Sequence, residues 1–369
     1  MKKIMFVVAS RPNFMKVAPL VKEEKKRNIN FSILYTEQHR SEAMTGMIAE
    51  DLEMPNADYS LDLRNSVKSN SKIKKGLVFI KRFIEARNII KKDNPNIVVV
   101  VGDVFSSVYA TLIAKTLKIK VAHVEAGLRS FNNKMPEERS RKIIDRYADF
   151  LFTTEEEANA NLIKEGKDKL KIFLVGNIMI DSLIKNVGAA KKIHAYKKFG
   201  LKKRDYAVLT FHRHENITNK ERITSIIYSL NEIVKRIKVI FPLHPATKKQ
   251  LIKYGLLDSL TNIKGLKIAN PLGYLDMINL VMNSSFVITD SGGLQEETTY
   301  LRVPCLTIRT ETERPITVKV GTNTIVGLSE EKILFNVDNI LNKRDKSGKI
   351  PYLWDGKTAS RIIEILKNN

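Results

Sequence analysis

Residues 286–297, FVITDSGGLQEE, decide the fold of this chain. The apolar run 286–289 has the composition of a fully buried strand, and the residues after Gly293 are compatible with a helix. The two glycines between them permit a tight turn, because glycine adopts backbone conformations that are closed to other residues. The segment therefore predicts a strand, a turn and a helix in direct succession.

The turn in this segment has two interpretations. In the first, Ser291 caps the helix, and Glu296 and Glu297 complement the helix dipole. In the second, the free N–H groups at a glycine-flanked helix start hold a phosphate, and a carboxylate one turn later holds the hydroxyls of a sugar. The octapeptide 290–297 alone favours the first interpretation, so the rest of the chain has to decide.

The same alternation of apolar runs and amphipathic stretches recurs before and after residue 200. Buried runs separated by helices are typical of parallel sheets covered on both faces, and two series predict two doubly wound α/β domains joined near residues 176–205. The expected strands are KIMFVVA (3–9), FSILYT (31–36), NIVVVV (96–101), KVAHVE (120–125), FLFTT (150–154), YAVLTFH (206–212), KVIFPLH (238–244), GLKIAN (265–270), SFVITD (285–290) and VPCLTI (303–308).

The composition is that of a soluble globular protein. A chain of 369 residues with 43% hydrophobic side chains is long enough for two cores. Cys305 is the only cysteine and can form no intrachain disulfide, which fits a reducing compartment. The start, MKKIMFVVA, resembles a first strand rather than a signal peptide, and no window approaches the roughly 20 apolar residues of a membrane span. We therefore expect a cytoplasmic protein with no membrane association.

The net charge of +23 makes nucleic acid an alternative partner. The excess is spread along the chain and mixed with acidic residues, and only KKIHAYKKFGLKKR (191–204) lacks them. Aromatic residues that could stack on bases are sparse there, so a solvated face or linker is the preferred interpretation. We expect no nucleic-acid partner.

Polar and ionisable residues follow many of the expected strands, where ligands bind in sheets of this kind. Each has an ordinary alternative: Arg11 and Lys16 as surface cations, Asp103 as a helix cap. Two neighbouring carboxylates such as Asp103 and Glu125 would raise each other's pKa, which suits a base acting near neutral pH. The residues concerned are Arg11, Lys16, Asp103, Glu125, His212, His244, Ser291, Gly292 and Gly293.

The segment MPEERSR (135–141) supplies further charges. Glu137 and Glu138 would complement the dipole of a helix that starts at Pro136, and Glu137 lies four residues before Arg141, the spacing of an exposed helical pair. His123 and Glu125 form a His-x-Glu pattern that could hold a metal. No further ligand is suitably spaced, so a hydrogen-bonded core histidine is preferred and no metal is expected.

Seven segments occur in a fixed order along the chain. They are SRPNFMKVAPLV (10–21), TEQHR (36–40), VVVGDVFSSVYA (99–110), HVEAGLRSFNNKMPEERSR (123–141), TFHRHEN (210–216), DSGGLQEE (290–297) and RTETERPITVKVGTN (309–323). Together they resemble the non-hydrolysing UDP-N-acetylglucosamine 2-epimerases. The resemblance covers nearly the whole chain and implies an α/β fold of two doubly wound Rossmann-like domains facing a cleft, as in GT-B glycosyltransferases. It implies an N-terminal domain of residues 1–178 joined by the helix 356–369, with the acid–base residues, and a UDP-binding domain of residues 179–355.

The resemblance also implies roles for individual residues. It makes Asp103, Glu125, Glu137 and His212 catalytic, and Gln38, Arg213 and His244 part of a possible second, activator site. Phosphate oxygens would be bound by Ser291, Gly292 and Gly293, and the ribose by Glu297. The full set of implied substrate-binding residues is Arg11, Lys16, Arg141, Met277, Ser291, Gly292, Gly293, Glu297 and Arg314.

The implied reaction is reversible C2 epimerisation of UDP-N-acetylglucosamine to UDP-N-acetylmannosamine, an isomerase step of polysaccharide biosynthesis. No keto group adjoins C2, so the family first eliminates UDP to leave 2-acetamidoglucal and then adds it back with protonation on the other face. This requires acid–base groups on two faces and cations at the departing UDP, with no cofactor. Family members are usually homodimers.

This chain departs from the family pattern at a few positions. Asn13 stands where many members have an acid, Met277 where bacterial relatives have an aromatic platform for uracil, and Ser41 where a glutamine-type contact is found. The alternatives are an epimerase of a related nucleotide sugar of the diacetamido-uronic acid type and a GT-B glycosyltransferase. The latter would need an acceptor and would leave C2 unchanged.

Overall fold

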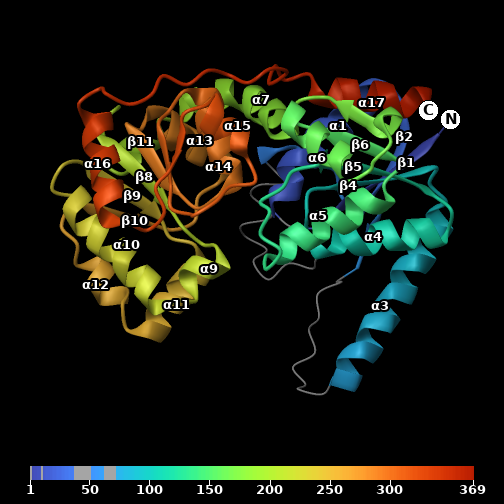
Figure 1. Ribbon diagram of the computed structural model, residues 1–369, viewed down its shortest axis with the longest axis horizontal. Helices are drawn as coiled ribbons and strands as arrows, with labels where there is room; N and C mark the ends of the chain where they lie inside the picture. The colour runs from blue at the N-terminus through green and yellow to red at the C-terminus, as the bar shows by residue number, and fades with distance from the viewer. Residues whose placement is uncertain (1, 10, 37–50, 62–71) are drawn as a thin grey trace. The chain divides into compact units, whose positions relative to one another are not determined.

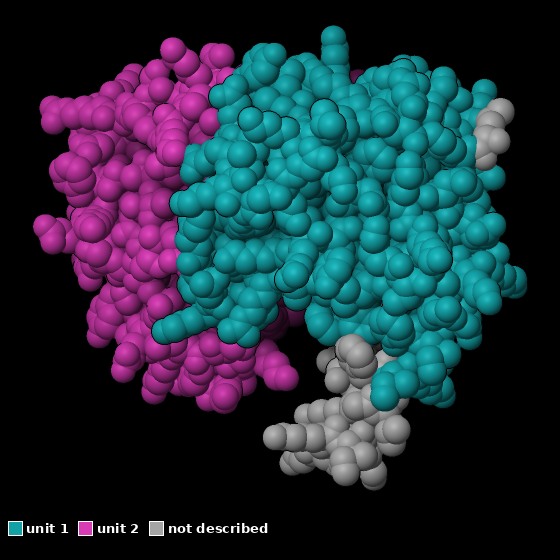
Figure 2. All heavy atoms as spheres, turned by 45° about the vertical axis from the view of Figure 1, so that its right-hand side comes forward, with its two compact units in different colours: residues 1–182, 352–369 teal, residues 183–351 magenta. Residues whose placement is uncertain are grey.

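The structure, a computed structural model, describes residues 2–9, 11–36, 51–61 and 72–369, with the side chains of residues 11, 12, 72–77 and 79 outside the description. These residues form two sheets flanked by helices, so the α/β prediction is confirmed (Figure 1). The chain divides into two compact units (Figure 2). Unit 1 is Met1–Ser182 with Tyr352–Asn369, and unit 2 is Leu183–Pro351.

Unit 1 contains a seven-stranded parallel sheet in the order β3-β2-β1-β4-β5-β6-β7. Its strands are β1 (Lys3–Val8), β2 (Asn30–Tyr35), β3 (Tyr59–Ser60), β4 (Ile97–Val101), β5 (Lys120–Ala126), β6 (Phe150–Thr153) and β7 (Ile172–Leu174). Its helices are α1 (Arg11–Lys26), α3 (Lys72–Asp93), α4 (Phe105–Thr116), α5 (Pro136–Tyr147), α6 (Glu156–Lys164), the 3-10 turn η1 (Lys169–Lys171), the start of α7 (Ile178–Ile193), and α17 (Thr358–Asn368).

Unit 2 contains a six-stranded parallel sheet in the order β10-β9-β8-β11-β12-β13. Its strands are β8 (Tyr206–Thr210), β9 (Lys238–Pro242), β10 (Leu266–Ala269), β11 (Phe286–Thr289), β12 (Cys305–Thr307) and β13 (Asn323–Ile325). Its helices are α8 (Ala195–Lys198), α9 (His214–Ile217), α10 (Lys220–Ile233), α11 (Pro245–Tyr254), α12 (Leu257–Thr261), α13 (Tyr274–Asn283), α14 (Gly292–Leu301), α15 (Pro315–Lys319) and α16 (Glu330–Leu341).

The central strands are apolar because helices cover both faces of each sheet. All five residues of β4, IVVVV, are buried, as are all four of β11, FVIT. A strand with only one covered face would alternate apolar and polar side chains. Since all strands of a sheet run in one direction, their carboxyl ends share one edge. The turns after β4 and β5 lie at this edge of the unit 1 sheet, and the turn after β11 lies at the corresponding edge of the unit 2 sheet.

None of the helices formed by the described residues is both long and apolar enough to cross a bilayer.

The helix α17 returns to unit 1 and packs against α1. Arg27, the residue after α1, pairs with Glu364 and donates to the hydroxyl of Ser360, 2.8 Å away. Before the helix begins, the chain passes so close to Gly176 that a Cβ there would lie 2.2 Å from the carbonyl oxygen of Leu353. Only glycine fits at that crossing.

A buried carboxylate holds the first turn of α17. Asp181, on α7, accepts the backbone N–H of Ala359 at 2.7 Å and is 6% exposed. Burial, which outweighs the hydrogen bonds from Ala359 and Thr358, raises the pKa of Asp181 to about 6. An aspartate with a raised folded-state pKa stabilises the fold below its unfolded pKa and loses that contribution as the pH rises through the folded value.

We therefore expect Asp181→Asn to stabilise the protein at neutral pH. The amide keeps an acceptor for Ala359 and removes the buried charge. The free energy of unfolding in urea is expected to exceed that of the wild type by about 2–3 kcal/mol above about pH 7, and to match it below about pH 4. The control is Asp355→Asn. Burial opposes ionisation of Asp355, but hydrogen bonds from Arg361 and Lys357 outweigh burial and lower its pKa. The ionised carboxylate therefore stabilises the fold, and we expect Asp355→Asn to lower the free energy of unfolding at neutral pH. A gain from Asp181→Asn that does not vary with pH would contradict this account.

Candidate active site

The end of β5 carries Glu125 in an uncommon backbone conformation. Its φ is +71°, and the pairing with β6 shifts register between Val124 and Ala126. A residue in the left-handed region costs free energy unless it is glycine, and bulges of this kind redirect a side chain. Glu125 is nevertheless 2% exposed and held in place. The strand thus ends in a strained turn that directs one carboxylate.

Lys16 of α1 is the partner of that carboxylate. Its Nζ lies 2.6 Å from Glu125 Oε2, and the two side chains are 11% and 2% exposed. Gly102 leaves them room, since a Cβ there would lie 3.4 Å from Lys16 Nζ. The neighbouring Asn13 donates from Nδ2 to the carbonyl oxygen of Val101 at 2.9 Å. An ionised carboxylate cannot donate this bond, which accounts for asparagine at this position.

Asp103 follows β4 and pairs with Arg141 of α5. Arg141 is 2% exposed and also lies 2.9 Å from Glu138 Oε2. The spacing argument for an exposed Glu137–Arg141 pair is therefore wrong, because Arg141 turns inward toward Asp103 and Glu138. Each of the carboxylates Asp103 and Glu125 faces a cation, whereas the sequence interpretation had them acting on each other.

Glu138 is a structural carboxylate that the sequence argument treated as a dipole residue. It is completely buried, and its Oε2 accepts the backbone N–H and hydroxyl of Ser130 at 2.9 and 3.0 Å. Burial opposes ionisation, but the bonds from Ser130 and Arg141 outweigh it and lower the pKa of Glu138. Glu137, in contrast, is half-buried, and the described part of the chain offers its side chain no hydrogen bond or ion pair. Glu138 thus fixes Arg141, and Glu137 stays available.

His123 is a buried core residue, as the preferred sequence interpretation has it. Its Nδ1 lies 2.6 Å from Asp145 Oδ1 and its Nε2 lies 2.9 Å from the carbonyl oxygen of Gly102. Both ring nitrogens are therefore occupied and neither can ligate a metal together with Glu125.

In unit 2, the turn DSGG leads into α14 as predicted, but Ser291 does not cap the helix. It occupies the N-cap position without a side-chain cap hydrogen bond, and the first turn of the helix contains no acidic residue. The capping interpretation is therefore wrong for this turn. The N–H groups at the start of α14 are of the kind that bind anions in other proteins. At Gly292 a Cβ would lie 2.8 Å from Glu313 Oε1, so a larger residue would have to displace that carboxylate.

Asp290, just before this turn, holds the loop after β8. The side chain is fully buried and accepts the backbone N–H groups of His212, at 3.0 Å, and Arg213, at 2.9 Å. It also accepts Asn216 Nδ2 at 3.0 Å. The loop FHRHEN and the turn DSGG are thus fastened to each other. Sequence reasoning missed this role, although the position directly after a strand was a signal for it.

Two histidines stack on each other at this edge, and a buried carboxylate holds two arginines. His212 stacks on His244 with ring centroids 5.2 Å apart, and the imidazole of His244 caps α11 by accepting the N–H of Ala246. Arg213 lies 3.0 Å from Glu313 Oε1, and Arg309 lies 2.8 Å from Glu313 Oε2. Burial opposes ionisation of Glu313, yet the surrounding arginines hold its pKa well below the usual range. The sequence argument did not single out Glu313.

Arg314 is positioned by α14. Its Nε lies 2.7 Å from Glu296 Oε1, and its side chain is 9% exposed. The loop before it is tied down by buried Gln295, whose Oε1 accepts Thr312 at 2.6 Å and Asn323 at 3.1 Å. One helix therefore sets both the DSGG turn and the RTETERP segment.

Glu297, one turn into α14, has a partner that the sequence analysis missed. Tyr274 donates its phenol to Glu297 Oε1 at 3.0 Å, and both residues are buried. Burial and the nearby carboxylate raise the pKa of Tyr274 well above its ordinary value, so the phenol remains a donor. Met277 packs, half-buried, against a core cluster of unit 2. The bond from Tyr274 fixes the orientation of the Glu297 carboxylate.

Some predicted residues lie outside the described parts. Gln38 and Ser41 are among residues 37–50, and for Arg11 the description is confined to the backbone at the start of α1. Their expected roles stay predictions.

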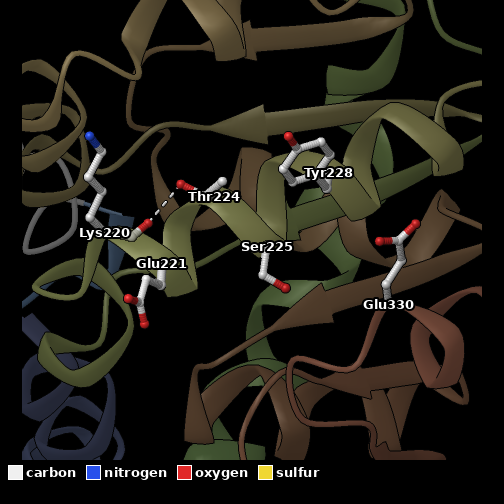
Figure 3. A pocket seen from close by; sticks show the side chains of 6 residues that line it. All are labelled: Lys220, Glu221, Thr224, Ser225, Tyr228 and Glu330. Carbon is white, nitrogen blue, oxygen red and sulfur yellow. Dashed lines mark hydrogen bonds between the residues drawn. The ribbon is translucent and has the colours of Figure 1, made fainter.

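The structure has a surface pocket of about 420 Å³ that includes none of these residues. Figure 3 shows its six lining side chains, which come from α10 and the start of α16. Tyr228 is 64% exposed there, and the Thr224 hydroxyl bonds to its own helix. The lining residues are Lys220, Glu221, Thr224, Ser225, Tyr228 and Glu330. These are surface side chains of two helices, and the pocket lacks the buried charged residues that are found at the strand ends.

Comparisons with known proteins bear on the identity of these motifs. A family model described as UDP-N-acetylglucosamine 2-epimerase matches residues 22–367. The UDP-N-acetylglucosamine 2-epimerase of Methanocaldococcus jannaschii is 40% identical, with 99% of this chain and 98% of the relative covered. A crystal structure of the M. jannaschii enzyme in complex with UDP-GlcNAc and UDP superposes with a TM-score of 0.90 at 39% identity, covering 100% of both chains. A UDP-2,3-diacetamido-2,3-dideoxy-D-glucuronate 2-epimerase of Pseudomonas aeruginosa is 34% identical, with 99% of each chain covered.

These matches confirm the resemblance inferred from the ordered motifs. Because the family model and the relatives extend over almost the whole chain, both units and both groups of strand-end residues are included. The chain belongs to the UDP-N-acetylglucosamine 2-epimerase family.

Proposed function

We propose that the protein interconverts UDP-N-acetylglucosamine and UDP-N-acetylmannosamine by inverting C2. In this mechanism UDP leaves C1 as the C2 proton is removed in an anti elimination, which leaves 2-acetamidoglucal. UDP then adds back to C1 in a syn addition while C2 receives a proton on the other face. Protons and charge balance without a redox step.

The observation that carries this proposal is the pair of charged contacts at the ends of β4 and β5. Glu125 with Lys16 and Asp103 with Arg141 place carboxylates beside cations on one edge of the sheet. A carboxylate can accept or return the C2 proton, and a neighbouring cation stabilises negative charge on departing UDP. Glu137, on the first turn of α5, is the third proposed acid–base group.

Unit 2 supplies the proposed UDP-binding groups. The start of α14, with Ser291, Gly292 and Gly293, suits phosphate oxygens, and Arg314 adds a cation. Glu297, oriented by Tyr274, suits the ribose hydroxyls. His212 lies beside Asp290 and His244, and is the proposed residue for the departing diphosphate.

A second candidate substrate is a diacetamido-uronic acid nucleotide sugar. The P. aeruginosa relative named for that activity is 34% identical over 99% of this chain. The M. jannaschii relative is 40% identical, which favours UDP-N-acetylglucosamine.

The test is proton NMR of UDP-N-acetylglucosamine incubated with the protein in heavy water. We expect UDP-N-acetylmannosamine to form and both sugars to acquire deuterium at C2, because the proton returned to carbon comes from a group that exchanges with solvent. The diacetamido-uronic nucleotide is the parallel substrate. Inversion that retains the original C2 hydrogen would exclude elimination with solvent exchange, and exchange with only the uronic nucleotide would select the second candidate.

A further inference from the structure

The buried His123 connects the two turns that carry Asp103 and Glu125. It lies on β5 two residues before Glu125, and its Nε2 contacts the carbonyl oxygen of Gly102, the residue before Asp103, at 2.9 Å. Its Nδ1 lies 2.6 Å from Asp145 on α5. The ring therefore joins the end of β4 to α5.

Asp145 extends this connection to the end of β5. Its Oδ2 accepts the backbone N–H of Gly127 at 3.1 Å and Arg129 Nη2 at 2.7 Å. The strained residue Glu125 thus has a fastened residue on each side, His123 before it and Gly127 after it. A strained backbone persists only where the surroundings over-determine it.

The hydrogen-bond partners fix the orientation of the ring. The carbonyl oxygen of Gly102 lies 2.9 Å from Nε2, and Asp145 Oδ1 lies 2.6 Å from Nδ1. Because both ring nitrogens have a partner, the ring cannot turn without losing a contact.

Further contacts hold the partners of the ring. Arg129 Nη2 lies 2.7 Å from Asp145 and 2.7 Å from Glu165, so the arginine fixes the Asp145 carboxylate. Toward Gly102 lies the ion pair of Lys16 and Glu125. His123 therefore links two groups that are themselves held in place.

We propose that His123 is a positioning residue that holds the turn of Asp103 and the turn of Glu125 in register. The proposal rests on the acid–base roles given to these two carboxylates. The ring touches no reacting atom. It sets where the two carboxylates lie, and errors of about 1 Å in such positions cost up to about 100-fold in rate.

The first test follows the two turns directly. In ¹H–¹⁵N spectra of the labelled protein, we expect His123→Gln and His123→Asn to shift the amide signals of Asp103 and Gly127 and to leave those of unit 2 unchanged. Amide signals of both turns at their wild-type positions in either folded variant overturn the proposal.

The second test separates positioning from stability. Glutamine can donate to Gly102 but turns its carbonyl toward Asp145, so one of the two bonds is lost. We expect His123→Gln to lower kcat for C2 inversion by about 10- to 100-fold, with KM and the Kd for UDP unchanged. The matched control is Ser32→Ala on β2, which removes a buried hydrogen bond to Asp93 of α3 and is expected to leave kcat unchanged.

A His123→Gln variant with wild-type kcat, or one whose kcat falls no further than its UDP affinity, overturns the positioning role. A wild-type protein that leaves C2 unchanged removes the proposed function instead, and with it the reaction that His123 would serve.

Discussion

We expect Glu125→Gln to lower the rate of C2 inversion by about 100-fold or more, the usual scale for a lost general acid or base. The amide keeps the shape of the side chain at the strained end of β5 but cannot take or return the C2 proton. It also leaves Lys16 without the negative partner that lies 2.6 Å away in the wild type. The Kd for UDP, measured by calorimetry, is expected to stay within a few-fold, because most of the proposed UDP contacts are made by unit 2.

Asp149→Asn is the matched control for this variant. Asp149 lies beside the start of the same strand, accepts Val121 N–H at 2.8 Å and pairs with Lys115 at 2.9 Å. Its substitution removes a comparable lysine–carboxylate pair from the other end of β5. Equal loss of turnover in both variants would show that the effect arises from strand stability, and an active Glu125→Gln protein would remove Glu125 from the acid–base set.

The largest stability effect is expected for Gly127→Ala, two residues after Glu125. Gly127 has φ +77°, and a Cβ there would lie 2.4 Å from the backbone carbonyl oxygen of Ala158. The left-handed backbone alone costs about 1–2 kcal/mol for a residue with a Cβ. The clash with a fixed backbone atom adds about 1–3 kcal/mol, as in overpacked cores.

Gly166→Ala separates the cost of the left-handed backbone from the cost of the clash. Gly166 has nearly the same φ, +78°, with nothing within 4 Å of its Cβ position. We expect urea unfolding to show a loss of about 1–2 kcal/mol for Gly166→Ala and about 2–5 kcal/mol for Gly127→Ala. Similar losses in the two variants would mean that Ala158 moves aside without cost.

The sequence predicted the interior strands of both sheets and missed three of the four edge strands. The runs that became β4 and β11 were evident because both faces are covered, so that all their residues are buried and only Thr289 is polar. The missed strands β3, β7 and β13 have two, three and three residues and lie at the edges of the two sheets. So short a segment contains too few residues for a pattern to be recognised.

The position of a candidate site residue was predictable where the residue follows a strand, and was not predictable where it depends on contacts across the fold. Asp103 and Glu125 were expected at one edge of the sheet because β4 and β5 are parallel. Arg141 was assigned to Glu137 because helical spacing was the available information, while its partner Asp103 is 38 residues away.

Tyr274 illustrates the same limit in unit 2. It meets Glu297 across 23 residues of intervening chain, and nothing in the local sequence marks the pair. Contacts of this kind are set by the packing of α13 on α14, which periodicity does not encode.

The return of α17 to unit 1 has a consequence for biosynthesis. Unit 1 uses residues 1–182 and 352–369, so the ribosome makes all of unit 2 before the helix that contacts α1 is available. At about 5–20 residues per second, residues 183–351 take roughly 10–30 s to translate. Ile362, Ile363 and Leu366, which are completely buried in the finished protein, do not yet exist during that interval. In a nascent chain paused within unit 2, the surface of α1 that α17 later covers is therefore exposed. We expect a chaperone to bind first at this surface.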